Sequence, residues 1–243
     1  MKVFITGVSE GIGRALALQL IAEGHDVWGV ARREEYLATL TEEAASPSLK
    51  TSLCDVADMT SCKEVVRAMR EAHFVPDVFV LNAGVFVPDI AESFDFDAHH
   101  ISFGVNVHGA LIWVAEFLPD CLLRGSGAFI AISSTAAFRP SGSASYSGSK
   151  AALSIAFRQF AMSFADRGVT FSVLHFGPID TRLWPGRRMF LIPKPEAAAR
   201  AVAALFDKKS GSYFFPRVTT TLLRASLFVP DRVFRWAARL LRP

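Results

Sequence analysis

The sequence predicts an α/β fold, a single-domain, Rossmann-type, doubly wound parallel sheet with helices on both faces. Three observations predict it. Apolar segments without polar alternation, such as residues 78–81 and 128–132, are typical of strands buried on both faces of a parallel sheet. Segments with apolar residues at helical spacing alternate with these strands, which is the pattern of right-handed βαβ units. The first unit contains a glycine-rich turn between strand and helix.

The elements follow one another along the chain in this alternation. Residues 3–5 form a short apolar strand, and Ile12, Leu16 and Leu20 then recur at helical spacing. Two later segments, 111–118 and 151–164, are apolar nearly all round, which indicates helices buried on several sides. We expect further strands at residues 27–31, 49–53, 78–81, 128–132 and 169–176, further helices at 34–44 and 59–72, and irregular segments at 86–97, 141–148 and 182–195.

Composition and charge divide the chain near Thr181. Hydrophobic residues make up 51% of the 243 residues and charged residues 20%, which excludes disorder as the main state. Residues 1–181 hold 13 Lys/Arg and 20 Asp/Glu, whereas residues 182–243 hold 13 Lys/Arg and 3 Asp/Glu. The basic character of the chain is therefore confined to its C-terminal quarter.

The cysteines and histidines exclude several kinds of site. Cys54, Cys62 and Cys121 form no CxxC pair, so neither a disulfide framework nor a zinc site is indicated. The six histidines form no HExxH motif, and we expect no metal. The apolar stretch at residues 3–5 is too short for a signal peptide, and no uninterrupted apolar segment reaches the ~18 residues of a spanning helix. We expect a cytoplasmic protein.

The turn after the first strand has the composition of a phosphate-binding loop. It reads Thr6-Gly7-Val8-Ser9-Glu10-Gly11-Ile12-Gly13. Glycines there let the backbone turn tightly and approach a pyrophosphate, and the following helix offers free N–H groups at its N-terminus. The spacing differs from GxGxxG, and ordinary strand-to-helix turns also contain glycine, so the turn alone leaves both interpretations open.

Six further segments follow in an order that carries a family resemblance. They are Asp55-Val56, Asn82-Ala83-Gly84, Asn106, Ser133-Ser134, Tyr146-Ser147-Gly148-Ser149-Lys150 and Gly177-Pro178-Ile179-Asp180-Thr181. Together with the TGxxxGxG turn, they make residues 1–181 resemble the short-chain dehydrogenase/reductase family. The resemblance implies an NAD(P)-binding Rossmann core with the catalytic residues in 1–181. Residues 182–243 would then be a substrate-covering segment and a basic apolar tail of the same domain.

Tyr146 and Lys150 are the candidate reactive pair. Four residues apart, they share one face of a helix. An ammonium group at ~4 Å would lower the phenol pKa by about three units, toward 7. Taken alone, this spacing is also that of a solvated helix face. The resemblance implies that Tyr146 is the general acid/base, that Lys150 lowers its pKa and holds the nicotinamide ribose, and that Asn106 anchors a water and proton relay.

The catalytic serine is one of two neighbours. Ser133 has the thirteen-residue spacing to Tyr146 that is usual in the family, whereas Ser134 has the local pattern, being followed by Thr135-Ala136-Ala137. We favour Ser134, whose hydroxyl would bind the substrate carbonyl as charge develops on its oxygen. Either serine could instead cap the end of the strand.

The resemblance also implies the cofactor contacts. Asp55 and Val56 would contact the adenine, although an Asp at a strand end is commonly a helix cap. Thr181 would hold the nicotinamide carboxamide. The full set is Gly7, Ser9, Glu10, Gly11, Ile12, Gly13, Arg32, Arg33, Asp55, Val56, Asn82, Ala83, Gly84, Tyr146, Lys150, Gly177, Pro178, Ile179 and Thr181.

The end of the second strand predicts the cofactor type. A carboxylate there selects NAD(H), and an arginine accommodates the 2′-phosphate of NADP(H). Ala31 occupies the acidic position and Arg32-Arg33 follow, so we expect NADP(H), with NAD(H) as the alternative. Glu10 would repel the phosphate unless Arg32 or Arg33 neutralises it.

The predicted function is NADP-dependent interconversion of a carbonyl and a secondary alcohol. Residues 183–185 and 189–192 are apolar where the family has a mobile covering segment, which favours a lipophilic small molecule, unless the segment merely packs on the core. The alternative is a non-catalytic NADP(H)-binding sensor or regulatory protein. Binding of nucleic acid is not expected, because the arginines of the tail alternate with large apolar groups.

Two kinds of protein contact are expected as well. Relatives pair the helices corresponding to 111–118 and 151–164, so a homodimer or homotetramer is expected. The basic amphipathic tail allows two interpretations, peripheral contact with an anionic membrane or coverage of the core or a neighbouring subunit by Phe228, Phe234, Trp236 and Leu240.

Overall fold

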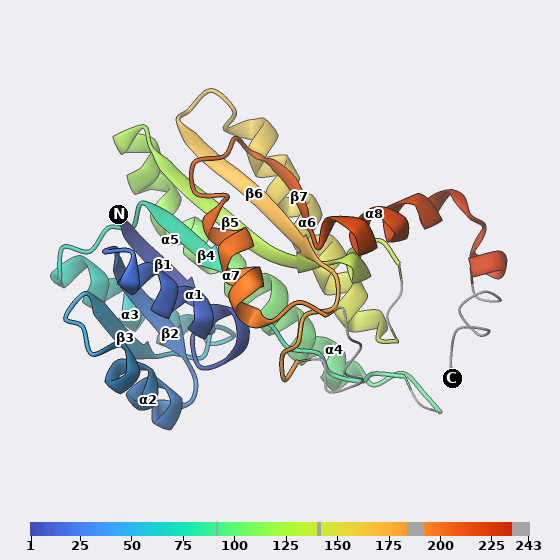
Figure 1. Cartoon of the computed structure of the whole chain (residues 1–243), viewed down its shortest axis with the longest axis horizontal. Helices are drawn as coiled ribbons and strands as arrows, with labels where there is room; N and C mark the ends of the chain where they lie inside the picture. The colour runs from blue at the N-terminus through green and yellow to red at the C-terminus, as the bar shows by residue number, and fades with distance from the viewer. Residues whose placement is uncertain (91, 140–141, 184–191, 235–243) are drawn as a thin grey trace.

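The computed structural model describes residues 1–90, 92–139, 142–183 and 192–234. Seven strands form one parallel sheet in the order β3-β2-β1-β4-β5-β6-β7, with helices on both sides (Figure 1). This confirms the predicted fold class. The strands are β1 Lys2–Thr6, β2 Asp26–Ala31, β3 Leu49–Leu53, β4 Val78–Leu81, β5 Gly127–Ser134, β6 Val169–Phe176 and β7 Gly211–Phe215. The helices are α1 Gly11–Ala22, α2 Glu34–Ala44, α3 Met59–Glu71, α4 Phe96–Phe103, α5 Gly109–Arg124, α6 Ala144–Ser163, α7 Pro195–Ala203 and α8 Arg217–Ala225.

Residues beyond Thr181 complete the sheet. Strand β7 pairs with β6 along its whole length, from Gly211 opposite Ser172 to Phe215 opposite Phe176. Helix α7 buries Ala198, Ala199 and Val202 completely on the same side of the sheet as α1. Neither element was predicted, and this C-terminal quarter therefore contributes to the core of the fold.

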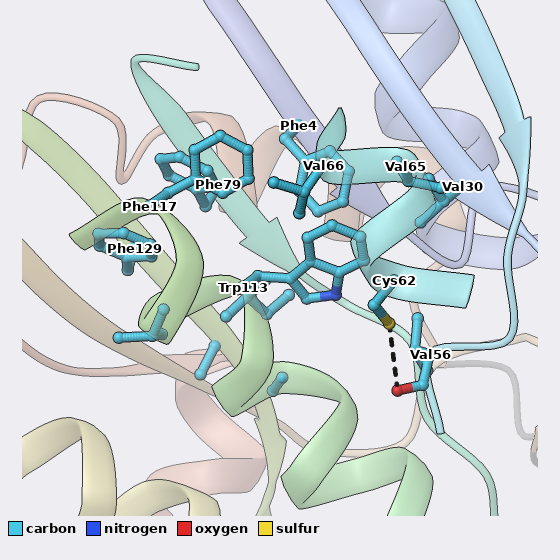
Figure 2. Packing of buried hydrophobic residues seen from close by; sticks show 14 of the residues in the cluster. Phe4, Val30, Val56, Cys62, Val65, Val66, Phe79, Trp113, Phe117 and Phe129 are labelled. Carbon is cyan, nitrogen blue, oxygen red and sulfur yellow. Dashed lines mark hydrogen bonds between the residues drawn. The ribbon is translucent and has the colours of Figure 1, made fainter. Parts of the chain in front are cut away.

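Two apolar layers enclose the sheet. On one side, α3, α5 and α6 pack around Phe4, Phe79 and Trp113 (Figure 2). On the other, α1, α2 and α7 contribute residues such as Leu16 and Leu40. In the first layer, the rings of Phe79, Phe129 and Phe171, from three adjacent strands, stack with interplanar angles of 10° and 8°. Aromatic contacts across β4, β5 and β6 therefore stabilise the centre of the sheet.

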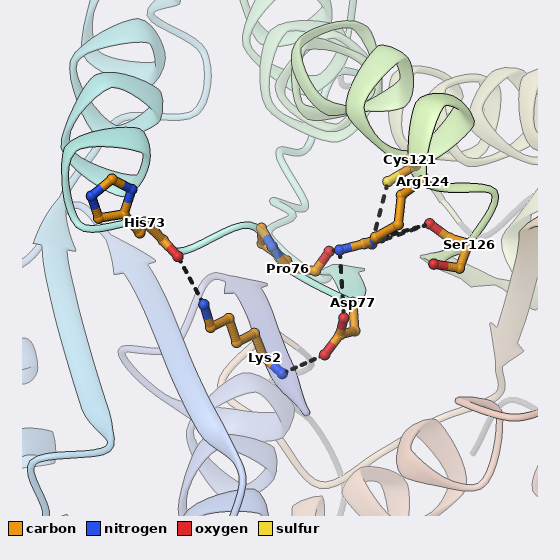
Figure 3. A network of polar contacts seen from close by, with 7 residues as sticks. All are labelled: Lys2, His73, Pro76, Asp77, Cys121, Arg124 and Ser126. Carbon is orange, nitrogen blue, oxygen red and sulfur yellow. Dashed lines mark hydrogen bonds and ion pairs between the residues drawn. The ribbon is translucent and has the colours of Figure 1, made fainter.

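A network of polar contacts lies at the amino-terminal ends of β1 and β4 (Figure 3). The backbone N–H of Lys2 donates to the Asp77 carboxylate at 2.8 Å, and the Lys2 ammonium donates to the carbonyl of His73 at 2.8 Å. Arg124, at the end of α5, lies 3.5 Å from Asp77 and donates to the carbonyl oxygen of Pro76 at 2.9 Å. The start of β1, the start of β4 and the end of α5 are therefore tied together.

Residues Phe96–Arg124 form one continuous helical rod of α4, a π-helical turn at Gly104–His108, and α5. Within the described residues, this helix is long and apolar enough to cross a membrane by length and composition. Half of its most apolar segment is buried inside the fold, where Trp113 and Phe117 pack against the sheet. It is thus a core helix.

Two of the segments expected to be irregular are partly helical. Helix α6 begins at Ala144, inside the expected irregular segment 141–148, because Ser143 caps it by accepting from the backbone N–H of Tyr146 at 3.1 Å. Helix α4 begins at Phe96, capped by Asp95. Of the expected covering segment, residues 184–191 lie outside the described residues, as do residues 235–243 of the tail, with Trp236 and Leu240.

Candidate active site

The glycine turn forms an open cradle at the N-terminus of α1. Gly7 and Gly11 have positive φ angles of 77° and 59°, a conformation that other residues rarely adopt. A Cβ on Gly13 would lie 2.3 Å from the carbonyl oxygen of Gly7, so only glycine fits there. The amide of Asn82 donates to the carbonyl of Thr6 at 2.9 Å and fixes the turn from β4. This backbone, with glycines at positions 7, 11 and 13 and the N-terminus of α1 beside them, fits a dinucleotide pyrophosphate.

The loop after β4 lies beside the cradle and faces the reactive side chains. The backbone N–H groups of Asn82 and Ala83 donate to the Thr6 hydroxyl at 3.0 and 2.9 Å. A Cβ on Gly84 would lie 3.2 Å from the Lys150 ammonium and 3.3 Å from the Asn106 side-chain oxygen. Sequence-distant residues of the predicted site thus converge at the carboxyl ends of β1 and β4.

Asn106 joins the β4 loop to α6. It lies in the π-helical turn, a feature that frequently occurs at functional sites, and is buried. Its side-chain oxygen accepts from Val85 N–H at 2.8 Å, and its amide donates to the Val85 carbonyl and to the Ser149 hydroxyl, each at 3.0 Å. The amide orientation is therefore fixed by three hydrogen bonds.

The hydroxyl groups of Ser133 and Ser134 point to different partners. The Ser133 hydroxyl is buried beneath α6, 2.8 Å from the Ser154 hydroxyl, and donates to the carbonyl of Lys150 at 3.2 Å. Ser134 accepts from the backbone N–H of Ala136 at 3.1 Å, and its hydroxyl lies near enough to the Tyr146 phenol to act on its pKa. Ser134 therefore lies beside the phenol, although its contact with Ala136 N–H is also that of a cap.

Burial sets the ionisation of the reactive pair. It raises the pKa of Tyr146 above its ordinary value, and the hydrogen bond from Ser134 opposes this only in part. Burial also lowers the pKa of Lys150 to about 8. The Lys150 ammonium donates to the carbonyl of Ile132 at 2.9 Å and lies 5.9 Å from the centre of the Tyr146 ring.

The expectation that Lys150 brings the Tyr146 pKa near 7 is therefore wrong for this arrangement. Desolvation of the buried phenolate is the largest influence on the Tyr146 pKa, and it raises that pKa. In this arrangement, Tyr146 is a protonated hydrogen-bond donor at neutral pH.

Asp89, which sequence reasoning missed, anchors the first turn of the helix that carries Tyr146 and Lys150. Its buried carboxylate accepts from the backbone N–H groups of Ala144 at 3.1 Å and Ser145 at 2.5 Å. Burial opposes its ionisation, yet hydrogen bonds from Ser145 and its neighbours hold the Asp89 pKa below its ordinary value. The contact spans 55 residues of sequence, and no local signal marks it.

Arg33 is held in place near the glycine turn. It donates to the Ser9 hydroxyl at 2.8 Å, lies 3.0 Å from the Glu10 carboxylate, and stacks 4.0 Å from the centre of the Tyr36 ring. Arg182, from the segment after β6, lies 3.6 Å from Glu10. The negative charge of Glu10 is thus compensated, in part by Arg33, one of the two arginines that the sequence offered for this role.

The structure also places the residues that were assigned to the adenine and to the nicotinamide end of the cofactor. Arg32 lies 3.8 Å from the Asp55 carboxylate, which accepts from Ala57 N–H at 3.0 Å. The cap of α3 is Asp58, not Asp55. Residues 177–181 return to the glycine turn, where the Thr181 methyl group would lie 3.3 Å from a Cβ on Gly11.

Comparisons with known proteins agree with this geometry. The family model described as short chain dehydrogenase matches residues 1–189. An NADPH-dependent pterin aldehyde reductase of Arabidopsis thaliana is 33% identical over 86% of this chain and 89% of its own length. The human protein named inactive hydroxysteroid dehydrogenase-like protein 1 is 28% identical over 98% of this chain and 74% of its own.

Solved structures show the same fold. An alcohol dehydrogenase from Thermococcus sibiricus, in complex with 5-hydroxy-NADP, superposes with a TM-score of 0.79 at 26% identity, covering 90% of this chain and 97% of that one. A 3-ketoacyl-(acyl-carrier-protein) reductase from Brucella melitensis, in complex with NADH, has a TM-score of 0.80 at 21% identity, covering 88% and 96%.

Proposed function

Because the chain belongs to the short-chain dehydrogenase/reductase family and is an NAD(P)-dependent oxidoreductase, we propose that it interconverts a carbonyl and a secondary alcohol of a lipophilic small molecule, using NADP(H). The observation that carries the proposal is a buried, protonated Tyr146 whose pKa is sensitive to the neighbouring Ser134 hydroxyl, at the sheet edge that holds the glycine cradle. A protonated phenol favours the reductive direction, in which the substrate oxygen needs a proton.

Each residue has a role in this reaction. The cofactor, when bound, supplies or accepts the hydride. In reduction, Tyr146 gives its proton to the substrate oxygen, while Ser134 stabilises the charge that develops there. Lys150 and Asn106 fix neighbouring backbone segments. The Lys150 ammonium donates to the carbonyl of Ile132, and the Asn106 side-chain oxygen accepts from the N–H of Val85. Gly7, Gly11 and Gly13 leave room for the pyrophosphate.

The preference for NADP(H) is supported by the environment of Arg33. A guanidinium already oriented by Ser9, Glu10 and Tyr36 loses little conformational freedom when it binds a phosphate. Ala31 offers no carboxylate to repel the 2′-phosphate or to bind a ribose hydroxyl.

Calorimetric titration of NADPH and NADH tests this preference. Arg33→Ala should weaken NADPH binding by about tenfold or more and leave NADH binding nearly unchanged. Arg32→Ala, which removes the neighbouring guanidinium on the Asp55 side, is the matched comparison. Equal affinities of the wild-type protein for the two cofactors would contradict the proposal.

A non-catalytic sensor is the second candidate, and the relative named as an inactive dehydrogenase-like protein favours it. The two candidates differ in turnover. A panel of carbonyl and alcohol substrates, sorted by chain length and ring content and followed by NADPH fluorescence, should reveal activity that Tyr146→Phe abolishes. Cofactor binding should survive that substitution. Cofactor binding with no turnover across the panel would instead support the sensor.

We also propose that the protein is a cytoplasmic homo-oligomer. Leu123 and Met162, near the ends of α5 and α6, are 91% and 76% exposed, as expected for surfaces that pair between subunits. Cys54, Cys62 and Cys121 are free thiols, which fits a reducing compartment. Sedimentation velocity should give a dimer or tetramer that Leu123→Arg with Met162→Arg shifts toward monomer.

A peripheral membrane contact through the C-terminal arm, here residues 217–234, is part of the proposal. In α8 only Thr220 is buried, whereas Val218 and Phe228 are 74% and 93% exposed. Phe228 therefore does not cover the core of its own chain. Binding to anionic vesicles should weaken with salt and disappear in Phe228→Asp.

A further inference from the structure

A cavity of about 590 Å³ lies outside the active site, between α6, the edge formed by β6 and β7, and the arm that begins with α8. None of Ser134, Tyr146, Lys150 and Asn106 lines it. Its walls are mainly apolar, with Phe138, Ile155, Phe214 and Leu227 as the largest groups. Its size and apolar character are those of small-molecule sites in proteins.

Two uncompensated cations line this cavity. Arg158 of α6 and Arg224 of α8 both belong to its wall, and the lining contains no carboxylate. In the part of the chain that the structure describes, neither arginine forms an ion pair. The Arg224 guanidinium stacks 4.2 Å from the centre of the Phe214 ring, which orients it along the wall. The cavity therefore combines an apolar body with a positive rim.

The charges of the two arginines also act on His175, a buried residue of β6 that belongs to the wall of the cavity. His175 is 1% exposed and lies between the rings of Phe138 and Phe214, with centroid distances of 4.7 and 4.9 Å. Burial lowers the pKa of His175 to about 4, and the charges of Arg224 and Arg158 add to that lowering. At neutral pH the imidazole is uncharged, so the two arginines supply the charge of the cavity.

The outer wall is held by a buried arginine. Arg139, whose side chain is 7% exposed, lies 2.5 Å from the Asp231 carboxylate and donates to the carbonyl of Val229 at 2.8 Å. It also donates to both the hydroxyl and the carbonyl oxygen of Ser226, next to the lining residue Leu227. The outer wall of the cavity thus belongs to a segment with defined contacts, and the cavity is open to solvent at Ile155 and Leu227, which are 61% and 45% exposed.

We propose that this cavity binds an amphipathic monocarboxylate, with its carboxylate at Arg158 and Arg224 and its hydrocarbon body against Phe138, Ile155, Phe214 and Leu227. A guanidinium pair matches the planar geometry of a carboxylate. A neutral lipophile would leave both cations uncompensated, and a small inorganic anion would leave the apolar walls unfilled. The site reaches the catalytic strand, because His175 Nδ1 lies 3.4 Å from the carbonyl oxygen of Ser134.

Calorimetry with decanoate below its micelle concentration tests the proposal on the intact, NADPH-saturated protein. We expect saturable binding of decanoate and none of decyltrimethylammonium, which has the same chain length and the opposite charge. Arg158→Gln and Arg224→Gln should each raise the Kd about tenfold. Leu227→Trp should abolish binding by filling the cavity. Arg67→Gln, on the exposed face of α3, is the matched control and should change nothing.

Binding at the active site is excluded by separate variants. Ser134→Ala and Tyr146→Phe should leave the decanoate affinity unchanged, because neither side chain lines the cavity. The proposal is overturned if decanoate does not bind, or if Arg158→Gln with Arg224→Gln leaves the Kd unchanged while circular dichroism shows a folded protein. It is also overturned if sedimentation shows that Leu227→Trp dissociates an oligomer whose association decanoate does not change. The lining of the cavity is then a subunit contact.

Discussion

At the scale of single residues, Ser133 and Ser134 have hydroxyl groups with different surroundings. The Ser133 hydroxyl bonds to α6 from below, through Ser154 and the carbonyl of Lys150. The Ser134 hydroxyl lies near the Tyr146 phenol and opposes the rise of its pKa. One group therefore holds the catalytic helix against the sheet, and the other lies where a substrate carbonyl would be bound.

Replacing each serine by alanine should separate these roles. Ser134→Ala should reduce kcat by about 10² to 10³, the usual effect of losing one donor to a developing oxyanion. Ser133→Ala should leave kcat within a few-fold but lower the free energy of unfolding by about 1 to 2 kcal/mol, because a buried partner is lost. Steady-state kinetics and urea unfolding measure both. The opposite ranking in kcat would assign the substrate contact to Ser133.

The anchor of α6 gives a prediction about pH. The Asp89 pKa is depressed in the folded protein, so its stabilising contribution is present above the unfolded-state value of about 4 and is lost as pH falls through the folded-state value. Asp89→Asn should therefore destabilise the protein at pH 7, by about 1 to 3 kcal/mol. The difference in unfolding free energy between Asp89→Asn and the wild-type protein should become smaller in acid.

Urea unfolding at several pH values measures this gap. Asp97→Asn, at an exposed carboxylate in the first turn of α4, is a suitable control. A constant difference between Asp89→Asn and wild type from pH 7 to pH 3 would contradict an ionised anchor.

At the scale of elements, the glycine turn depends on close approach between backbone segments. Gly13→Ala would bring a Cβ against the Gly7 carbonyl, so the cradle must open. We expect NADPH affinity to fall at least about a hundredfold, a loss of ~2.7 kcal/mol. Gly211→Ala, at the start of β7, meets only the Tyr213 ring at ordinary contact distance and should leave affinity unchanged. Fluorescence titration of both variants gives the answer.

Most elements were predictable from their apolar patterns, whereas β7 and α7 were not. β4 is buried and apolar throughout, and β6 is buried and apolar at most positions, as expected for strands covered on both faces. β7 lies at the sheet edge and carries the half-buried sequence Gly-Ser-Tyr-Phe-Phe, which has neither a buried run nor clear alternation. α7 buries alanines, whose small side chains give a weak pattern of apolar spacing.

The candidate site was predictable only as far as its motifs are local. Tyr146 and Lys150 are fixed by helical spacing, and the glycine turn by its own sequence. Asp89 joins the site through a contact across 55 residues, and Arg182 lies 3.3 Å from the Tyr36 hydroxyl, across 146 residues. Such partners depend on the order of strands in the sheet.

At the scale of the whole molecule, Arg139 connects the C-terminal arm to the body of the fold through several contacts. Arg139→Met keeps the length of the side chain but removes its bonds to Ser226, Val229 and Asp231. Trypsin should then cut the arm after Arg224 or Arg232 at least about tenfold faster than in wild type, while the sheet stays intact, because local opening becomes more frequent. Arg200→Met, on α7, is the control. Unchanged cleavage would mean that other contacts hold the arm.

The stacked rings of Phe79, Phe129 and Phe171 make the centre of the sheet visible to spectroscopy. Rings fixed at interplanar angles of 10° and 8° are held in a chiral array, and near-ultraviolet circular dichroism reports such fixed packing. The phenylalanine fine structure should therefore include a contribution from the packing of β4, β5 and β6. The tryptophan bands, in contrast, would follow Trp28 on β2 and Trp113 on α5, in the same layer. A refolding experiment recorded at both wavelengths would compare in time the packing of the aromatic rings with that of the two indoles.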